Sequence, residues 1–184
     1  MNPIGVAYNF FAGVTPTLLA DDINLDSPPG DIRMMLRTAR LTQGWQNWSV
    51  ASKLGTDPEL AGLDTPAKLL VVTDTQPERL LNSRSGRLHL FPGMPEGVTV
   101  AFRHFQARGG FLVSAERVEG ETSFVEIESR REVECQVMNP WPGREVAVRE
   151  ARSGQVLSPT VDRTHGECLV FPTRRGGDYV LQPR

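Results

Sequence analysis

Two pairs of glutamates have the spacing at which paired carboxylates could act on a sugar. Glu126 and Glu128, and likewise Glu132 and Glu134, are separated by one residue. On an extended strand the members of such a pair share one face and lie about 6–7 Å apart, and glycoside hydrolysis uses two carboxyl groups roughly 5–9.5 Å apart. Both members of a pair would reach a ligand from the same side, however, and the apolar alternation through Cys135 directs Glu132 and Glu134 to solvent. We therefore expect a solvated sheet face and predict no catalytic residue.

The histidines give no second route to catalysis. His89, His104 and His165 are dispersed, and no Ser/His/Asp order, His-x-x-x-His pair or nucleotide-binding glycine-rich loop accompanies them. His104 alternates with Phe102 and Gln106, which predicts a histidine on one face of a sheet. We predict neither a cofactor nor a metal site.

Aromatic rings are the remaining candidates for ligand binding. The flat ring of a tryptophan can stack on the apolar face of a sugar. Trp45 and Trp48 are three residues apart and would share a helix face, while Trp141 stands between Pro140 and Pro142, where we expect a turn and partial exposure. These three tryptophans are weak ligand-binding candidates, and ordinary packing is the competing interpretation.

The two cysteines are expected to be buried free thiols. Cys135 and Cys168 both lie in apolar stretches and form no Cys-x-x-Cys motif. Two cysteines are too few for a disulfide scaffold. The sequence leaves open whether they bond to each other across a sheet.

The composition restricts the class of protein. The chain has 184 residues, of which 39% are apolar and 23% charged, as in one soluble domain or a domain with a short attachment. Twenty basic and 22 acidic side chains leave no positive surplus, so nucleic-acid binding is not expected. The longest uncharged stretch, residues 1–20, is interrupted by Pro3, Gly5 and Pro16 and has no basic start. We therefore predict neither a transmembrane span nor a secretory signal, and the chain as written is expected to be cytoplasmic.

The first 85 residues carry a helical pattern. Ile32, Met35 and Leu36 recur at helical spacing within residues 31–41, which follow two prolines. Two weaker helices are predicted over residues 45–54 and from about residue 66 or 77 to residue 81. These pieces make no convincing independent core, so we expect Ile32, Met35 and Leu36 to find too few apolar partners in this chain.

After residue 86 the apolar period changes from a helical one to two. Val98, Val100 and Phe102 alternate with other residues, as half-buried strands require. About eight short strands are predicted, over residues 88–91, 98–103, 110–118, 122–129, 132–137, 145–150, 167–171 and 179–181. Glycine turns separate them, among them Gly93, Gly97, Gly109-Gly110, Gly120, Gly143, Gly154 and Gly176-Gly177. The sequence therefore predicts a mainly β fold: an antiparallel β-sandwich over residues 86–184, preceded by a short, mostly helical segment over residues 1–85. A barrel is the alternative.

Several segments, taken in order, resemble glycoside hydrolase family 95, the α-L-fucosidase-like enzymes. They read RLHLFPGMP at residues 87–95, FQARGGF at 105–111, NPWPG at 139–143 and GGDYVL at 176–181, with PERLLNSRSG at 77–86 before them. In that family these segments follow a catalytic (α/α)6 toroid and build a C-terminal β-domain. The resemblance covers about half of the chain. It implies that residues 77–86 end the toroid and that the β-sandwich is its C-terminal domain.

The chain departs from the family where the chemistry would be. Residues 63–75 read LDTPAKLLVVTDT and lack the Gln-Ile-Asp-Gly-Asn type segment that carries a catalytic carboxylate in the family, so Asp64 and Asp74 do not inherit its role. Twelve helices do not fit into 85 residues at about 1.5 Å rise per residue. We expect no activity from this chain alone, although its parent would be a hydrolase.

The resemblance therefore implies a non-catalytic, structural region of a glycoside hydrolase acting on carbohydrates. Its partner would be the helical toroid, or a second copy bound through the N-terminal segment, and carbohydrate is a further candidate. A parent of this family could be secreted. Two alternatives stay open: a free-standing carbohydrate-binding β-sandwich module and a small complete glycoside hydrolase.

Overall fold

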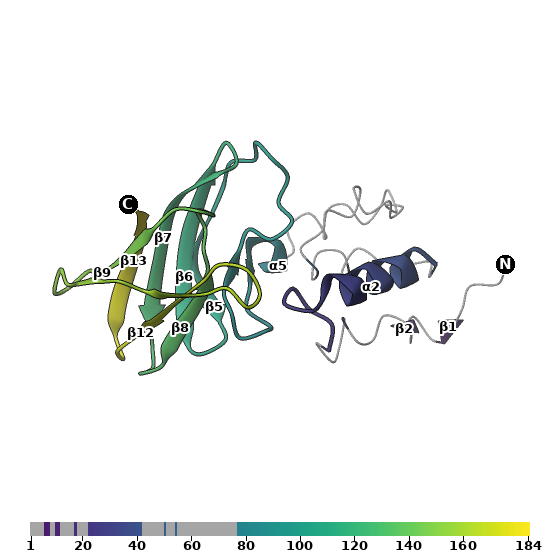
Figure 1. Ribbon diagram of the computed structural model, residues 1–184, viewed down its shortest axis with the longest axis horizontal. Helices are drawn as coiled ribbons and strands as arrows, with labels where there is room; N and C mark the ends of the chain where they lie inside the picture. Colours follow the sequence, from purple (N-terminus) through teal and green to yellow (C-terminus); the bar gives the residue numbers. More distant parts are fainter. Residues whose placement is uncertain are drawn as a thin grey trace. The chain divides into compact units, whose positions relative to one another are not determined.

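The computed structural model describes residues 6–7, 10–11, 17, 22–41, 50, 54 and 77–184. The chain divides into two compact units, which are described separately. The first comprises Met1–Leu80 and Phe91–Met94, and the second comprises Leu81–Leu90 and Pro95–Arg184. Figure 1 labels the main elements of both.

Helix α2 (Pro29–Leu41) confirms the helix predicted over residues 31–41. Proline is compatible with the first helical turn because the amide it lacks would have no partner there. Asp31 in the first turn and Arg40 in the last turn place charges that favour the helix dipole. The other described elements of this unit are short: β1 (Val6–Ala7), β2 (Phe10–Phe11), which pairs with β1 antiparallel, and α5 (Pro77–Leu80). Apart from residues 50 and 54, the helix predicted over residues 45–54 lies outside the described residues, and so does most of the one predicted from residue 66.

The first unit has a small apolar cluster of its own. Met35 and Ala39 of α2 are buried together with Val50 and Leu54. Further apolar side chains pack partly buried against this cluster: Ile23, Ile32 and Leu36. The expectation that Ile32, Met35 and Leu36 lack partners in this chain is therefore wrong, because residues 50 and 54 supply the contacts.

The segment Phe91–Met94 is joined to α5 by hydrogen bonds. The buried Arg79 donates from Nη2 to the Gly93 carbonyl at 3.1 Å, and the Phe91 amide donates to the Leu80 carbonyl at 2.9 Å. These bonds explain why a four-residue stretch inside the β region belongs with the first unit.

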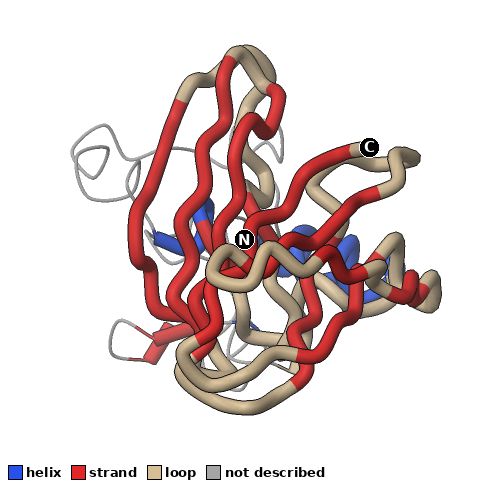
Figure 2. Tube along the Cα trace, turned by 90° about the vertical axis from the view of Figure 1, so that its left-hand side faces the viewer, coloured by secondary structure: helices blue, strands red, loops and turns tan. Residues whose placement is uncertain are grey.

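The second unit is built from antiparallel sheets (Figure 2). The larger sheet has six strands in the order β10 (Val156–Leu157), β9 (Val146–Glu150), β13 (Gly177–Pro183), β7 (Glu121–Ser129), β6 (Phe111–Val118) and β5 (Val100–Ala107). The smaller has three, in the order β11 (Thr160–Asp162), β12 (Cys168–Pro172) and β8 (Glu134–Met138). A third pairs β3 (Leu81–Asn82) with β4 (His89–Leu90). The predicted mainly β, sandwich-like fold preceded by a short helix is confirmed.

The core of this unit lies between the two larger sheets. Val125 and Ile127 of β7 and Cys135 and Val137 of β8 are fully buried and alternate with more exposed residues, as the period of two predicts. The ring of Phe171 on β12 packs on that of Tyr179 on β13, with centroids 5.7 Å apart. Aromatic burial of this kind, together with the aliphatic core, holds the three-stranded sheet against the six-stranded one.

A bulge interrupts β5 at His104. The pairing runs from Phe102 opposite Ala115 to Phe105 opposite Val113, so two residues of β5 oppose one of β6. His104 has φ of 52° and is exposed, and its amide donates to the Ser114 hydroxyl at 3.1 Å. The prediction that His104 shares a face with Phe102 is wrong, because the extra residue shifts the alternation.

The turn between β5 and β6 has the backbone that its two glycines predict. Gly109 and Gly110 have φ of 87° and 85°, a region that side chains with a Cβ rarely adopt. A Cβ at Gly110 would lie 3.1 Å from Cγ of Arg131, and the Gly110 carbonyl accepts from the Arg130 amide at 2.9 Å. The preceding Arg108 amide donates to the Ser83 hydroxyl at 3.0 Å. The turn is thus fixed by its conformation and by its neighbours.

We expect Gly110→Ala to destabilise the chain by about 1 kcal/mol or more, because the substitution adds backbone strain and crowds Arg131. The measurement is the midpoint of urea unfolding followed by far-UV circular dichroism. Gly30→Ala is the control: Gly30 lies in α2, and a Cβ there meets nothing within 4 Å, so it should not destabilise. An unfolding midpoint of Gly110→Ala equal to or above that of wild type would contradict the expected backbone strain.

Candidate functional site

The segment Asn139–Gly143 forms a closed turn between the two larger sheets. The Asn139 Oδ1 accepts from the Trp141 amide at 2.9 Å, and its Nδ2 donates to the Arg144 carbonyl at 3.1 Å. The Arg144 amide donates to the Trp141 carbonyl at 3.0 Å, and Gly143 adopts φ of 76°. An asparagine side chain that bonds the backbone two residues ahead is a common way to fix such a turn.

Trp141 lies inside the unit. Its side chain is 5% exposed, and the indole Nε1 donates to the Thr122 carbonyl of β7 at 2.7 Å. The expectation of partial exposure is wrong, because the ring packs inside the unit and its N–H is bonded to β7. A buried ring whose N–H is already bonded offers no stacking face to a sugar, so nothing in its surroundings supports Trp141 as a ligand-binding residue. The other two candidates, Trp45 and Trp48, lie outside the described residues, as do Asp64 and Asp74.

Glu167 directly precedes β12, and its carboxylate is hydrogen-bonded to this turn. One oxygen accepts from the Gly143 amide at 2.9 Å and from Asn139 Nδ2 at 3.2 Å. The other lies 3.8 Å from Nη2 of Arg163. The Gly143 amide, then Asn139, then the charge of Arg163 lower the pKa of Glu167 below its ordinary value of 4.5. Glu167 therefore stays ionised near neutral pH and is unsuited to donate a proton as a general acid.

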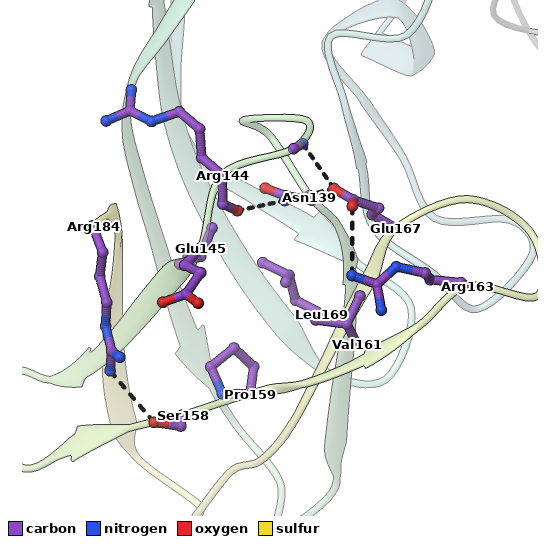
Figure 3. Close-up of a pocket in the computed structure, with 12 residues that line it drawn as sticks. Asn139, Arg144, Glu145, Ser158, Pro159, Val161, Arg163, Glu167, Leu169 and Arg184 are labelled. Carbon is purple, nitrogen blue, oxygen red and sulfur yellow. Dashed lines mark hydrogen bonds and ion pairs between the residues drawn. The ribbon is translucent and has the colours of Figure 1, made fainter.

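Beside this carboxylate lies a groove of about 320 Å³ (Figure 3). This volume is near the lower end of the roughly 300–1,000 Å³ range of small-molecule sites. Its rim is polar and its floor is apolar. The rim includes Asn139, Gly143, Arg144, Glu145, Ser158, Arg163, Glu167 and Arg184, and the floor includes Val146, Pro159, Val161 and Leu169.

Backbone bonds bring the ends of the groove together. Glu145 directly precedes β9, and its carbonyl accepts from the Arg184 amide at 2.8 Å. The Arg184 guanidinium reaches the Ser158 hydroxyl at 3.4 Å. Figure 3 shows the Glu145 carboxylate on the groove side, between Arg184 and the apolar floor. The groove thus combines guanidinium donors with a carboxylate acceptor.

A second hollow, of about 480 Å³, lies at the other end of β8. Glu132, Glu134 and Glu150 line it together with Arg174 and Tyr179. Glu150 accepts from the amide and hydroxyl of Ser153, which lower the pKa of its carboxyl. Glu132 and Glu134 are exposed, as their alternation with Cys135 predicts. Glu150 therefore resembles Glu167 in being held as an anion.

The other predicted carboxylate pair lies on β7. Glu126 and Glu128 are both half-buried, and Glu128 lies 3.8 Å from Nε of Arg130. Asp162 also has a pKa below its ordinary value, because the Thr164 hydroxyl and amide donate to it. Among the described residues, three carboxyls have a shifted pKa, those of Glu150, Asp162 and Glu167, and in each the pKa is lowered. A general acid requires a raised pKa instead.

The two cysteines are buried free thiols, as predicted. They lie on neighbouring strands but in different register, since Cys135 is opposite Phe171 and Cys168 is opposite Met138. Burial raises the pKa of the Cys135 thiol, and the nearby Cys168 adds to the effect. A thiol with a raised pKa is a poor nucleophile at neutral pH.

Among the residues that the structure describes, no three His, Cys, Asp or Glu side chains gather as metal ligands would. Within the same residues, no helix is long and apolar enough to cross a membrane.

A scan of protein-family models finds no match to this chain, and a search of the curated proteins finds none either. The resemblance to family 95 therefore remains an interpretation of the sequence segments themselves.

Sequence reasoning missed the groove because its residues come from separate parts of the chain. Glu145, Ser158 and Arg184 converge only through the pairing of β13 with β9 and the path of the chain between β10 and β11. The only sequence feature they share is that each is a polar residue next to the end of a strand. That feature is too common to identify a binding site.

The contribution of Glu167 to stability should depend on pH. Its pKa is lowered in the folded chain, so its stabilising bonds are fully present above the ordinary value of 4.5 and are lost as the pH falls through the lower, folded pKa. We expect the difference in thermal midpoint between wild type and Glu167→Gln to be largest near neutral pH and to shrink as the pH falls below that ordinary value. Glu121→Gln, at an exposed position, is the control and should show no such dependence. A difference that stays constant from pH about 7 to about 3 would contradict the assignment.

Proposed function

We propose that this chain is a non-catalytic accessory region of a glycoside hydrolase similar to family 95, with the β unit serving as a structural domain. The observation that carries the proposal is that residues of the family-like segments hold the shape of the unit. Gly109 and Gly110 occupy turn positions of positive φ, Asn139 closes the turn after β8, and Trp141 anchors that turn to β7. Residues used in this way are typical of a scaffold.

The state of the carboxyl groups supports the same proposal. Glycoside hydrolysis requires one carboxylic acid with a raised pKa to protonate the leaving group. Glu150 and Glu167 are held as anions by hydrogen bonds from Ser153 and Gly143 respectively. Glu132 and Glu134 are exposed on a solvated edge. This arrangement favours a structural role over that of a small complete hydrolase.

The partner in this proposal is a helical catalytic domain. In family 95 the segments that resemble residues 77–95 connect the toroid to the β-domain. In this chain α5 and Phe91–Met94 are bonded to each other through Arg79 and Gly93, which supports a defined local structure for this region. Self-association of this chain is the competing arrangement, and sedimentation velocity of the chain with and without a family 95 toroid lacking its β-domain separates the two.

We expect the full chain to release no nitrophenol from 4-nitrophenyl α-L-fucoside or from other common aryl glycosides. The reason is that, within the part of the chain that the structure describes, no acid and base converge on one substrate position. The measurement is absorbance at neutral and mildly acidic pH with a family 95 enzyme as the positive control.

Hydrolysis that follows the chain through purification and disappears in Glu132→Gln or Asp64→Asn would contradict the non-catalytic assignment. Glu121→Gln is the matched control for these variants, because Glu121 is an exposed carboxylate at the start of β7 and lines neither hollow.

A further inference from the structure

The groove between the turn Asn139–Gly143 and the C-terminal strand β13 is lined as a ligand site would be. The proposed structural role does not require it. Three side chains define its chemistry: Glu145, Arg163 and Arg184. Arg163 is paired with Glu167 at 3.8 Å and Arg184 bonds Ser158 at 3.4 Å. Among residues 77–184, no ion pair or side-chain hydrogen bond occupies the Glu145 carboxylate.

We propose that this groove binds a neutral sugar residue through Glu145 and Arg184. The inference rests on the proposed function for the choice of carbohydrate over other polyols. A hydroxyl both donates and accepts hydrogen bonds, so neighbouring hydroxyls of one sugar satisfy the Glu145 carboxylate and the Arg184 guanidinium together.

The mixed charge of the rim disfavours ionic ligands. An anion drawn to Arg163 and Arg184 would lie against the Glu145 carboxylate, and a cation drawn to Glu145 would lie against the guanidiniums (Figure 3). Either arrangement places like charges close together, at a cost that a neutral polyol does not incur.

The floor supplies the apolar surface that the C–H face of a sugar ring requires. Val161 is 39% exposed and lies beside Pro159 and Leu169. Aliphatic side chains bury a ring face through ordinary hydrophobic contact. The sequence predicts tryptophans for this purpose, whereas this groove uses no aromatic side chain among its lining residues.

Part of the rim is held in place before any ligand binds: the Glu167 carboxylate and the backbone at Glu145. The Gly143 amide and Asn139 fix one oxygen of Glu167, and the Arg184 amide holds the Glu145 carbonyl at 2.8 Å. Less conformational freedom is then lost on binding, which favours affinity from a few contacts.

The test is a ¹H–¹⁵N correlation titration of the full chain with methyl α-L-fucopyranoside and methyl α-D-galactopyranoside. We expect saturable shifts of the amides of Gly143, Glu145 and Arg184. Glu145→Gln and Arg184→Gln should each weaken binding by about tenfold, because each loses a charge-assisted hydrogen bond. Glu121→Gln and Arg175→Gln, at exposed positions outside the groove, should bind as wild type does.

Three outcomes would overturn the inference. The first is no saturable shift with either glycoside, and the second is shifts that persist unchanged in both groove variants. The third is saturable shifts only with the galacturonate anion or inorganic sulfate, which would define an anion site. The spectra of the free variants report folding, and Arg184→Gln decides the matter if Glu145→Gln fails to fold. A negative titration would leave the accessory role intact, since the aryl-glycoside assay tests that role separately.

Discussion

Both the connection between the two larger sheets and the groove beside it depend on the hydrogen bond from the Trp141 indole to the Thr122 carbonyl. The chain leaves the three-stranded sheet after β8 and enters the six-stranded sheet at β9, so the connection must cross between the sheets. Trp141 lies in that connection and bonds β7 at 2.7 Å. The indole therefore fixes where the two sheets meet, and Asn139 and Gly143 complete the turn around it.

The groove depends on the same turn. Glu145 follows it by two residues, and Glu167 is held by the Gly143 amide and by Asn139. Arg163 in turn pairs with Glu167. A change that loosens the turn would move the polar rim as well, so the scaffold role and the proposed sugar site share one set of contacts. This sharing explains how a structural domain can also present a pre-formed binding surface.

The strands with clear alternation could be predicted from the sequence, and the short or irregular features could not. β8, and β7 from Val125 onward, bury every second residue, which is the pattern that predicts them. β10 and β11 contain two and three residues, too few to establish a period. The bulge at His104 and the inward rotation of Trp141 arise from tertiary packing. Likewise, the burial of Met35 requires Val50 and Leu54, whose contact with α2 no local pattern reveals.

The most direct test of this account is the stability of Trp141→Phe, which keeps an aromatic ring in the core and removes the bond to Thr122. The measurement is the free energy of unfolding from urea denaturation followed by far-UV circular dichroism. The account predicts a loss of about 1–3 kcal/mol, since the partly buried Thr122 carbonyl loses its donor. A change within about 0.5 kcal/mol, the size typical of surface substitutions, would contradict the claim that this contact fixes the connection between the two sheets.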